Sequence, residues 1–136
     1  MATGYSGTPL FRKLDLKPGM ACRALDPPEH YPAMLADLPE GIHFGDRSDR
    51  ALDFIHLFVL EADGLDDRLA ELRERINPAG MIWVSWPKKS SGVETDVNGN
   101  VVREAGFAAG LVDIKVCAVD ETWSGLKFVI PRAQRN

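Results

Sequence analysis

Two nearly continuous apolar runs constrain the fold of this chain more than any other feature. Leu52–Leu60 and Met81–Trp86 lack the alternation of a half-exposed strand, so each is expected to be a strand covered on both faces. Between them, Asp63–Ile76 carries apolar residues at helical spacing, with acidic residues in its first turn and arginines near its end. This strand, helix and strand predict two central parallel strands joined by a right-handed crossover.

Shorter elements surround this unit. The sequence predicts a helix opened by Thr8 and Pro9 within an N-terminal segment 1–19, a strand Met20–Leu25, a helix Tyr31–Leu38, a strand Ile42–Phe44, a helix Asn100–Ala109, a strand Leu111–Val119 and a last strand through Leu126, Phe128 and Ile130. The link between the last two strands is too short for a parallel crossover, so they should form an antiparallel hairpin. The whole chain, 1–136, is therefore expected to be one α/β domain with a three-layer, mostly parallel sheet of about six strands. The first, third and fourth strands should lie in the middle, the second at one edge and the hairpin at the other.

Local patterns predict how two helices are capped or ended, and which side chains of one strand share a face of the sheet. Glu61 and Asp63 should cap the helix that follows the first apolar run, and Pro78 should stop that helix after Ile76. Gly110 is placed as a left-handed stop for the helix before it. In Leu111–Val119, strict alternation puts the apolar side chains on one face and the two charged ones on the other, as in a strand near a sheet edge.

Composition excludes several classes of function. The chain has 136 residues, with 16 Lys plus Arg against 20 Asp plus Glu, a formal net charge of −4 that argues against a nucleic-acid partner. No apolar run is long enough to cross a membrane and the N-terminus lacks a secretory pattern, so a cytoplasmic protein is expected. Cys22 and Cys117 fit reduced thiols, and His30, His43 and His56 show no zinc-ligand spacing, so no metal is expected.

The order of the predicted elements resembles a known superfamily. Asn77–Ser85, with its Pro and Gly before an apolar strand, and the closing hairpin are similar to a shortened class I methyltransferase domain, which has a Rossmann-like fold. More closely, Gly4–Leu10, Trp83–Lys89 and Val119–Gly125 resemble a family of small bacterial proteins catalogued only as a domain of unknown function. That likeness covers nearly the whole chain and implies a methyltransferase-like fold and a bacterial origin. It brings no activity, so the question of an enzyme stays open.

The loop after the first strand differs from that of the methyltransferases resembled here. They bind S-adenosylmethionine on a Gly-rich loop at this place, whereas this chain has Asp26, Pro27, Pro28 and Glu29. Two prolines remove two N–H donors and fix two φ angles. Asp26 and Asp46 remain as cofactor-binding candidates, Asp46 for a ribose hydroxyl. S-adenosylmethionine is therefore not the expected cofactor, and a methyltransferase with an altered loop is kept as an alternative.

Polar and aromatic residues gather in the loops that should meet beyond the carboxyl ends of the strands. Tryptophans offer apolar faces, lysines positive charge, serines hydroxyls and two acidic residues acceptors, a mixture typical of small-molecule pockets. The candidate ligand-binding residues are Trp86, Lys88, Lys89, Ser90, Ser91, Asp120, Glu121, Trp123 and Ser124. The leading hypothesis is a binding domain for a small anionic or nucleotide-like ligand, with Gly4–Gly7 as a lid or a tail.

Two alternatives compete with that hypothesis. Lys88 could pair with Asp120 or Glu121 while the tryptophans complete the core, which would leave no site. The strand Leu111–Val119 could instead serve a non-catalytic interaction protein as the edge of a homodimer. The sequence shows no hydrolase elbow around a serine and no activated cysteine, so catalytic residues are not assigned.

Overall fold

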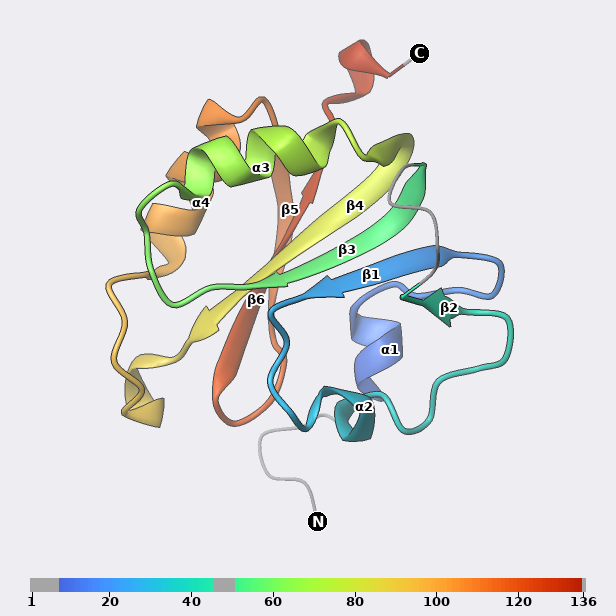
Figure 1. Ribbon diagram of the computed structural model, residues 1–136, viewed down its shortest axis with the longest axis horizontal. Helices are drawn as coiled ribbons and strands as arrows, with labels where there is room; N and C mark the ends of the chain where they lie inside the picture. Colours follow the sequence, from blue (N-terminus) through green and yellow to red (C-terminus); the bar gives the residue numbers. More distant parts are fainter. Residues whose placement is uncertain (1–7, 46–50, 136) are drawn as a thin grey trace.

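The computed structural model describes residues 8–45 and 51–135. They form a six-stranded sheet in the order β2-β1-β3-β4-β6-β5 (Figure 1). The strands are β1 (Ala21–Leu25), β2 (His43–Phe44), β3 (Leu52–Phe58), β4 (Ile76–Pro87), β5 (Val112–Ala118) and β6 (Trp123–Val129). The strands β1 to β4 run parallel to one another, and β6 is antiparallel to both β4 and β5. The predicted strand order, with the hairpin at one edge, is confirmed.

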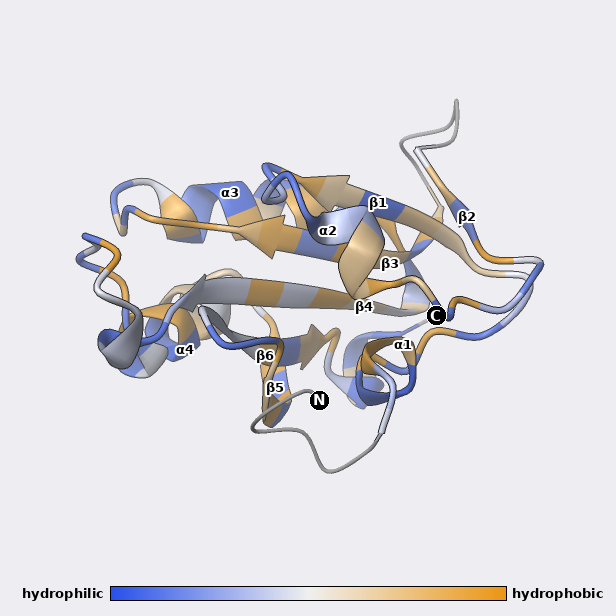
Figure 2. Ribbon diagram, turned by 90° about the horizontal axis from the view of Figure 1, so that it is seen from below, coloured by the Kyte–Doolittle hydropathy of each residue, from blue (hydrophilic) through white to orange (hydrophobic). Residues whose placement is uncertain are grey.

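Helices cover both faces of the sheet. They are α1 (Leu10–Lys13), α2 (Tyr31–Met34), α3 (Leu65–Arg73) and α4 (Gly99–Ala108), with short 3-10 turns η1 (Lys89–Ser91) and η2 (Arg132–Gln134). One buried cluster joins the sheet to α3 and α4, and a second joins its other face to α1 and α2. In Figure 2 much of α3 is hydrophilic, since only its buried leucines face the core. The expected three-layer α/β architecture is therefore present.

The helix after β3 is shorter than the sequence predicted, at both ends. Its N-cap is Gly64, in the left-handed conformation with φ +75°, and no side chain caps it, so the expected cap from Glu61 and Asp63 is wrong. Its C-terminal end precedes Ile76, which pairs with Leu52 and opens β4. Because the ladder with β3 satisfies this backbone, the chain extends here instead of continuing the helix.

Other boundaries shift by a few residues. The helix predicted to run from Tyr31 to Leu38 is regular only to Met34, and successive i+3 hydrogen bonds carry the chain on from there. The first helix begins at Leu10 rather than at Pro9. The strand predicted to reach Leu60 ends two residues earlier. The differences of one or two residues fall within the usual fraying of element ends, whereas the loss of four residues from the predicted Tyr31–Leu38 helix does not.

The helix α4 begins and ends with local signals. Asn98 caps it, since its Oδ1 accepts a hydrogen bond of 2.9 Å from the N–H of Val101. At the other end, Gly110 has φ +83°, which confirms the predicted left-handed stop.

The edge strand β5 does not alternate as its sequence suggested. A bulge lies between Asp113 and Lys115, so two consecutive charged positions face opposite sides of the sheet. Asp113 accepts a hydrogen bond of 3.0 Å from Arg103 of α4. Lys115 lies 3.1 Å from Asp15, which follows α1 on the other face. The prediction that both charges share one face is wrong, because the extra residue at Ile114 inverts the pattern.

Candidate functional site

A pocket of about 650 Å³ opens where the carboxyl ends of β1 and β3 lie side by side. From β1 the chain leaves toward the edge strand β2 and then returns to the other side of β1, so this is a topological switch point. Open α/β sheets bind ligands at such points. The described residues that line the pocket are Asp26, Pro28, Phe58, Val59, Leu60, Glu61, Asp63, Gly64, Leu65, Arg68 and Trp123.

The loop after β1 forms one wall. Asp26 turns the chain off the strand in the left-handed region, with φ +55°, and its exposed carboxylate lies 3.4 Å from the Nη2 atom of Arg68 on α3. Pro27 and Pro28 follow, and neither can donate a backbone hydrogen bond. This wall therefore offers side-chain charge and apolar surface in place of the amide cradle of a Gly-rich loop. Asp46, the other cofactor candidate, lies outside the described residues.

The connection between β3 and α3 forms a second wall, and a distant loop holds it in place. The hydroxyl of Thr95 donates to the carbonyl of Leu60 at 2.6 Å, and Asp96 Oδ1 accepts from the N–H of Ala62 at 2.8 Å. These bonds fix the backbone on either side of Glu61. The exposed side chains of Glu61 and Asp63 line the pocket from this connection.

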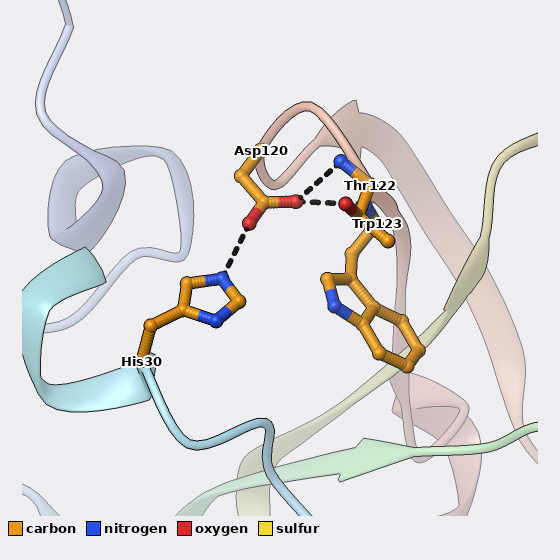
Figure 3. A network of polar contacts seen from close by, with 4 residues as sticks. All are labelled: His30, Asp120, Thr122 and Trp123. Atoms are coloured by element: carbon orange, nitrogen blue, oxygen red, sulfur yellow. Dashed lines mark hydrogen bonds and ion pairs between the residues drawn. The ribbon is translucent and has the colours of Figure 1, made fainter. Parts of the chain in front are cut away.

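The third wall is Trp123, which the turn between β5 and β6 fixes (Figure 3). Asp120 Oδ1 accepts hydrogen bonds from the N–H groups of Thr122 and Trp123, at 2.8 and 2.7 Å. Its Oδ2 atom lies 2.9 Å from Nε2 of His30, which belongs to the loop after β1. The indole of Trp123 then stands at 90° to the ring of Phe58, with ring centroids 5.0 Å apart. Asp120 thus ties two walls of the pocket together.

The structure brings together some of the predicted site residues and separates others. Trp123 lies in the pocket wall and Asp120 fixes it, but Trp86 faces the opposite side of the sheet, buried in the cluster with α3 and α4. Ser124 is paired with Trp86 in the ladder between β4 and β6, so it shares that side. Glu121 is exposed in the turn itself.

The predicted lysines and serines lie in the loop after β4. The N–H of Lys88 donates to the carbonyl of Thr122 at 2.7 Å, and the hydroxyl of Ser91 donates to the carbonyl of Lys88 at 2.6 Å. Lys89 and Ser90 are exposed in the 3-10 turn, and none of these four side chains lines the pocket. Asp120, which the sequence offered as a partner for Lys88, is paired with His30.

Sequence reasoning missed His30, Phe58 and Arg68. His30 and Asp120 are 90 residues apart, and no local pattern connects them. In the sequence, Phe58 resembles an ordinary core residue and Arg68 an ordinary helix-surface residue. Only their positions, Phe58 at the end of β3 and Arg68 in the first turn of α3, could have indicated a place in the site.

A buried polar chain lies beside the pocket but does not open into it. Tyr31 Oη is 2.9 Å from His56 Nδ1, and His56 Nε2 is 2.7 Å from Ser85 Oγ. Burial lowers the pKa of His56 to about 3 and raises that of Tyr31. Because Ser85 has no exposed surface, no substrate can reach its hydroxyl. His56 is therefore a packed core histidine.

The described residues form neither a metal-ligand cluster nor a membrane-spanning helix. No group of three or more His, Cys, Asp or Glu side chains in 8–45 and 51–135 is arranged to hold a metal ion. Within the same ranges, no helix has the length and apolar character that crossing a bilayer requires.

Residues 37–132 match a family described as "Protein of unknown function (DUF3052)". The chain belongs to this family. Membership fits the resemblance drawn from the sequence motifs, and it carries no activity. A comparison with curated proteins gave no match.

Solved structures with the same fold are methyltransferase-like. A TehB-like SAM-dependent methyltransferase from Corynebacterium glutamicum is 15% identical, with a TM-score of 0.56 over 94% of this chain and 90% of that one. A putative methyltransferase in complex with the Trm112 activator from Haloferax volcanii is 13% identical, with a TM-score of 0.62 over 93% and 89%. The [4+2]-cyclase SpnF is 12% identical, with a TM-score of 0.61 over 90% and 79%. At these identities the likeness establishes the fold, and the expected methyltransferase-like architecture is confirmed.

Proposed function

We propose that this member of the family binds a small organic molecule in the pocket at the carboxyl ends of β1 and β3, without transferring a methyl group. The observation that carries the proposal is the pocket itself, which combines apolar walls with a few charged groups at the switch point of the sheet. Pro27 and Pro28 disfavour the usual methyl donor, because they remove amide donors where a Gly-rich loop would supply them.

A spectroscopic titration tests this function. Amide and indole N–H signals of the ¹⁵N-labelled protein would be followed while S-adenosylmethionine, S-adenosylhomocysteine, ATP and choline are added separately to about 1 mM, a concentration that detects weak binding. We expect at least one compound to shift the signals of Trp123 and Gly64 in a saturable way. The variant Trp123→Leu should weaken that binding. If no compound shifts pocket signals, this function is contradicted.

The prediction of an anionic ligand has its own test. It depends on Lys88 and Lys89, whose side chains make no ion pair with other described residues but lie outside the pocket lining. Stabilisation of the protein by ATP or inorganic phosphate, lost in Lys88→Ala and Lys89→Ala, would place an anion at this loop. Stabilisation that survives both substitutions would contradict that assignment.

A methyltransferase with an altered cofactor loop is the second candidate. The fold favours it, since a solved neighbour is described as SAM-dependent. The same fold also occurs in a protein described as a cyclase, so the architecture does not decide the reaction. Calorimetric titration with S-adenosylmethionine and S-adenosylhomocysteine separates the candidates: micromolar binding of both would favour methyl transfer, and no heat at millimolar ligand would exclude it.

A further inference from the structure

The aromatic corner of the pocket offers one ring face to a ligand. Phe58 is only 3% exposed, and His56 stacks against it with ring centroids 4.2 Å apart. Trp123 is half-buried and perpendicular to Phe58, so the indole is the ring with surface left to present to the pocket. Tryptophan has the most favourable face for a cation, because the negative face of its π system attracts positive charge.

The charges around this indole are mainly negative. Asp26, Glu61 and Asp63 line the pocket together with Arg68, the one Lys or Arg among the described lining residues. Arg68 is engaged with Asp26 at 3.4 Å, whereas Glu61 and Asp63 form no ion pair with any other described residue. Two carboxylates of the pocket lining therefore have no counter-ion among the described residues.

The start of α3 does not reverse this balance. The N-terminus of a helix attracts anions, and Gly64 and Leu65 place that end of α3 in the wall of the pocket. Asp66 and Asp67 occupy its first turn and offset the dipole with their own negative charge. The local field thus favours a cationic ligand.

We infer that the pocket recognises an onium cation of the methylated ammonium type, carried by a small organic molecule. This inference rests on the proposed function, because it concerns the same pocket. An onium centre is large, weakly hydrated and without N–H donors, so it needs an aromatic face and nearby negative charge, not carboxylates placed at hydrogen-bonding distance. Trp123 supplies the face, while the exposed carboxylates of Glu61 and Asp63 supply the charge.

Matched ligand pairs test the positive charge directly. Choline is compared with 3,3-dimethylbutan-1-ol, its neutral isostere, and S-adenosylmethionine with S-adenosylhomocysteine, which lacks the methyl group and the charge. The readout is the titration of the Trp123 indole N–H signal in the full ¹⁵N-labelled chain, assigned with Trp123→Phe. We expect choline to bind about tenfold more tightly than its neutral isostere.

Two variants assign that preference to the pocket. Glu61→Gln removes one exposed carboxylate and should reduce the preference for the cation several-fold while the neutral partner is unaffected. Glu94→Gln removes the same charge from an exposed position outside the pocket lining, so it should change nothing. Because Glu61 makes no ion pair with other described residues, its substitution does not threaten the fold.

Each outcome has a defined meaning. A preference for choline over its neutral isostere supports the inference. A preference for S-adenosylmethionine without one for choline overturns it, because the pocket would then hold the methyl donor. Equal binding of choline and its neutral isostere overturns the inference but leaves the pocket as a binding site. Equal loss of cation binding in Glu61→Gln and Glu94→Gln also overturns it, because the effect would then come from net charge. Binding by none of the four compounds overturns it as well, and the proposed function then depends on ATP, the remaining compound of the wider titration.

Discussion

The Nε2 atom of His56 lies 2.7 Å from the Oγ atom of Ser85, and neither side chain has any exposed surface. With the hydroxyl of Tyr31 on the other ring nitrogen, both nitrogens of the imidazole are hydrogen-bonded in the centre of the core. A buried polar group costs little only when it is satisfied in this way. The contacts join α2, β3 and β4, so a neutral imidazole is part of the native packing.

Stability should therefore depend on pH through His56. Its pKa is about 3 in the folded protein because of burial, against about 6.5 when unfolded, so below pH 6.5 His56 binds a proton in the unfolded state but stays neutral in the native state. The contribution of neutral His56 to the free energy of unfolding should be fully present well above pH 6.5 and lost as the pH falls. The free energy of unfolding should therefore decrease by about 1.4 kcal/mol from pH 7.5 to pH 5.5. Urea denaturation at the two pH values measures this.

An exposed histidine provides the control for that measurement. His43→Gln should keep the same pH-dependent drop, because its side chain lies outside the core. A wild-type protein that is equally stable at pH 5.5 and 7.5 would show that His56 does not titrate as its burial requires.

The central strands of the sheet could be predicted because a strand that is buried on both faces has a continuously apolar sequence. Leu52–Phe58 and the apolar part of β4 are covered on both faces, so their sequences are continuously apolar. The bulge at Ile114 could not be predicted in this way. The alternation in the sequence is intact there, and only pairing with β6 shows that one residue is inserted.

The candidate site was predicted in part for a similar reason. Asp120 and Trp123 belong to a turn whose place at the carboxyl edge follows from strand order. The separation of Trp86 from Trp123 depends on the register of β4 against β6, in which Pro87 and not Trp86 is opposite Trp123. One residue of register changes the face of every side chain, and sequence patterns do not fix it.

The bulged edge of β5 should keep the protein monomeric. Val112, Ile114 and Val116 are exposed there, which by itself would favour pairing with a second copy. The bulge interrupts a continuous ladder, and Asp113 and Lys115 are already engaged within the chain. Light scattering after size exclusion should give the monomer mass at high protein concentration. A dimer that Ile114→Lys dissociates would contradict this prediction and support the edge-strand homodimer.

Asp15 should contribute a small, salt-dependent stabilisation. Its carboxylate lies 2.8 Å from Lys127 and 3.1 Å from Lys115, and although burial acts to raise its pKa, the hydrogen bonds from both lysines lower it overall. Asp15→Asn keeps the left-handed backbone, since Asn tolerates φ +63°, and removes only the charge. We expect a loss of up to about 1 kcal/mol in urea denaturation, reduced at high salt, because the site is partly exposed.

The matched control is the more exposed pair between Asp113 and Arg103. Asp113→Asn should cost less than Asp15→Asn, because it breaks a single contact with a surface arginine. An equal loss in the two variants, insensitive to salt, would show that the paired lysines add nothing at Asp15.

Gly106 lets α4 approach β6 more closely than any side chain would allow. A Cβ at this position would lie 2.1 Å from the ring of Phe128, which is 1% exposed and cannot move into solvent. Gly106→Ala should therefore lower the free energy of unfolding by about 1 to 3 kcal/mol, despite the better helix propensity of alanine. Gly99→Ala, in the same helix with its Cβ 3.5 Å from Trp86, should cost nothing.

Combining Gly106→Ala with Phe128→Leu should cost less than the sum of the two single changes, because the smaller side chain makes room. Urea denaturation of the four variants measures the coupling, and strictly additive losses would contradict a clash between α4 and Phe128.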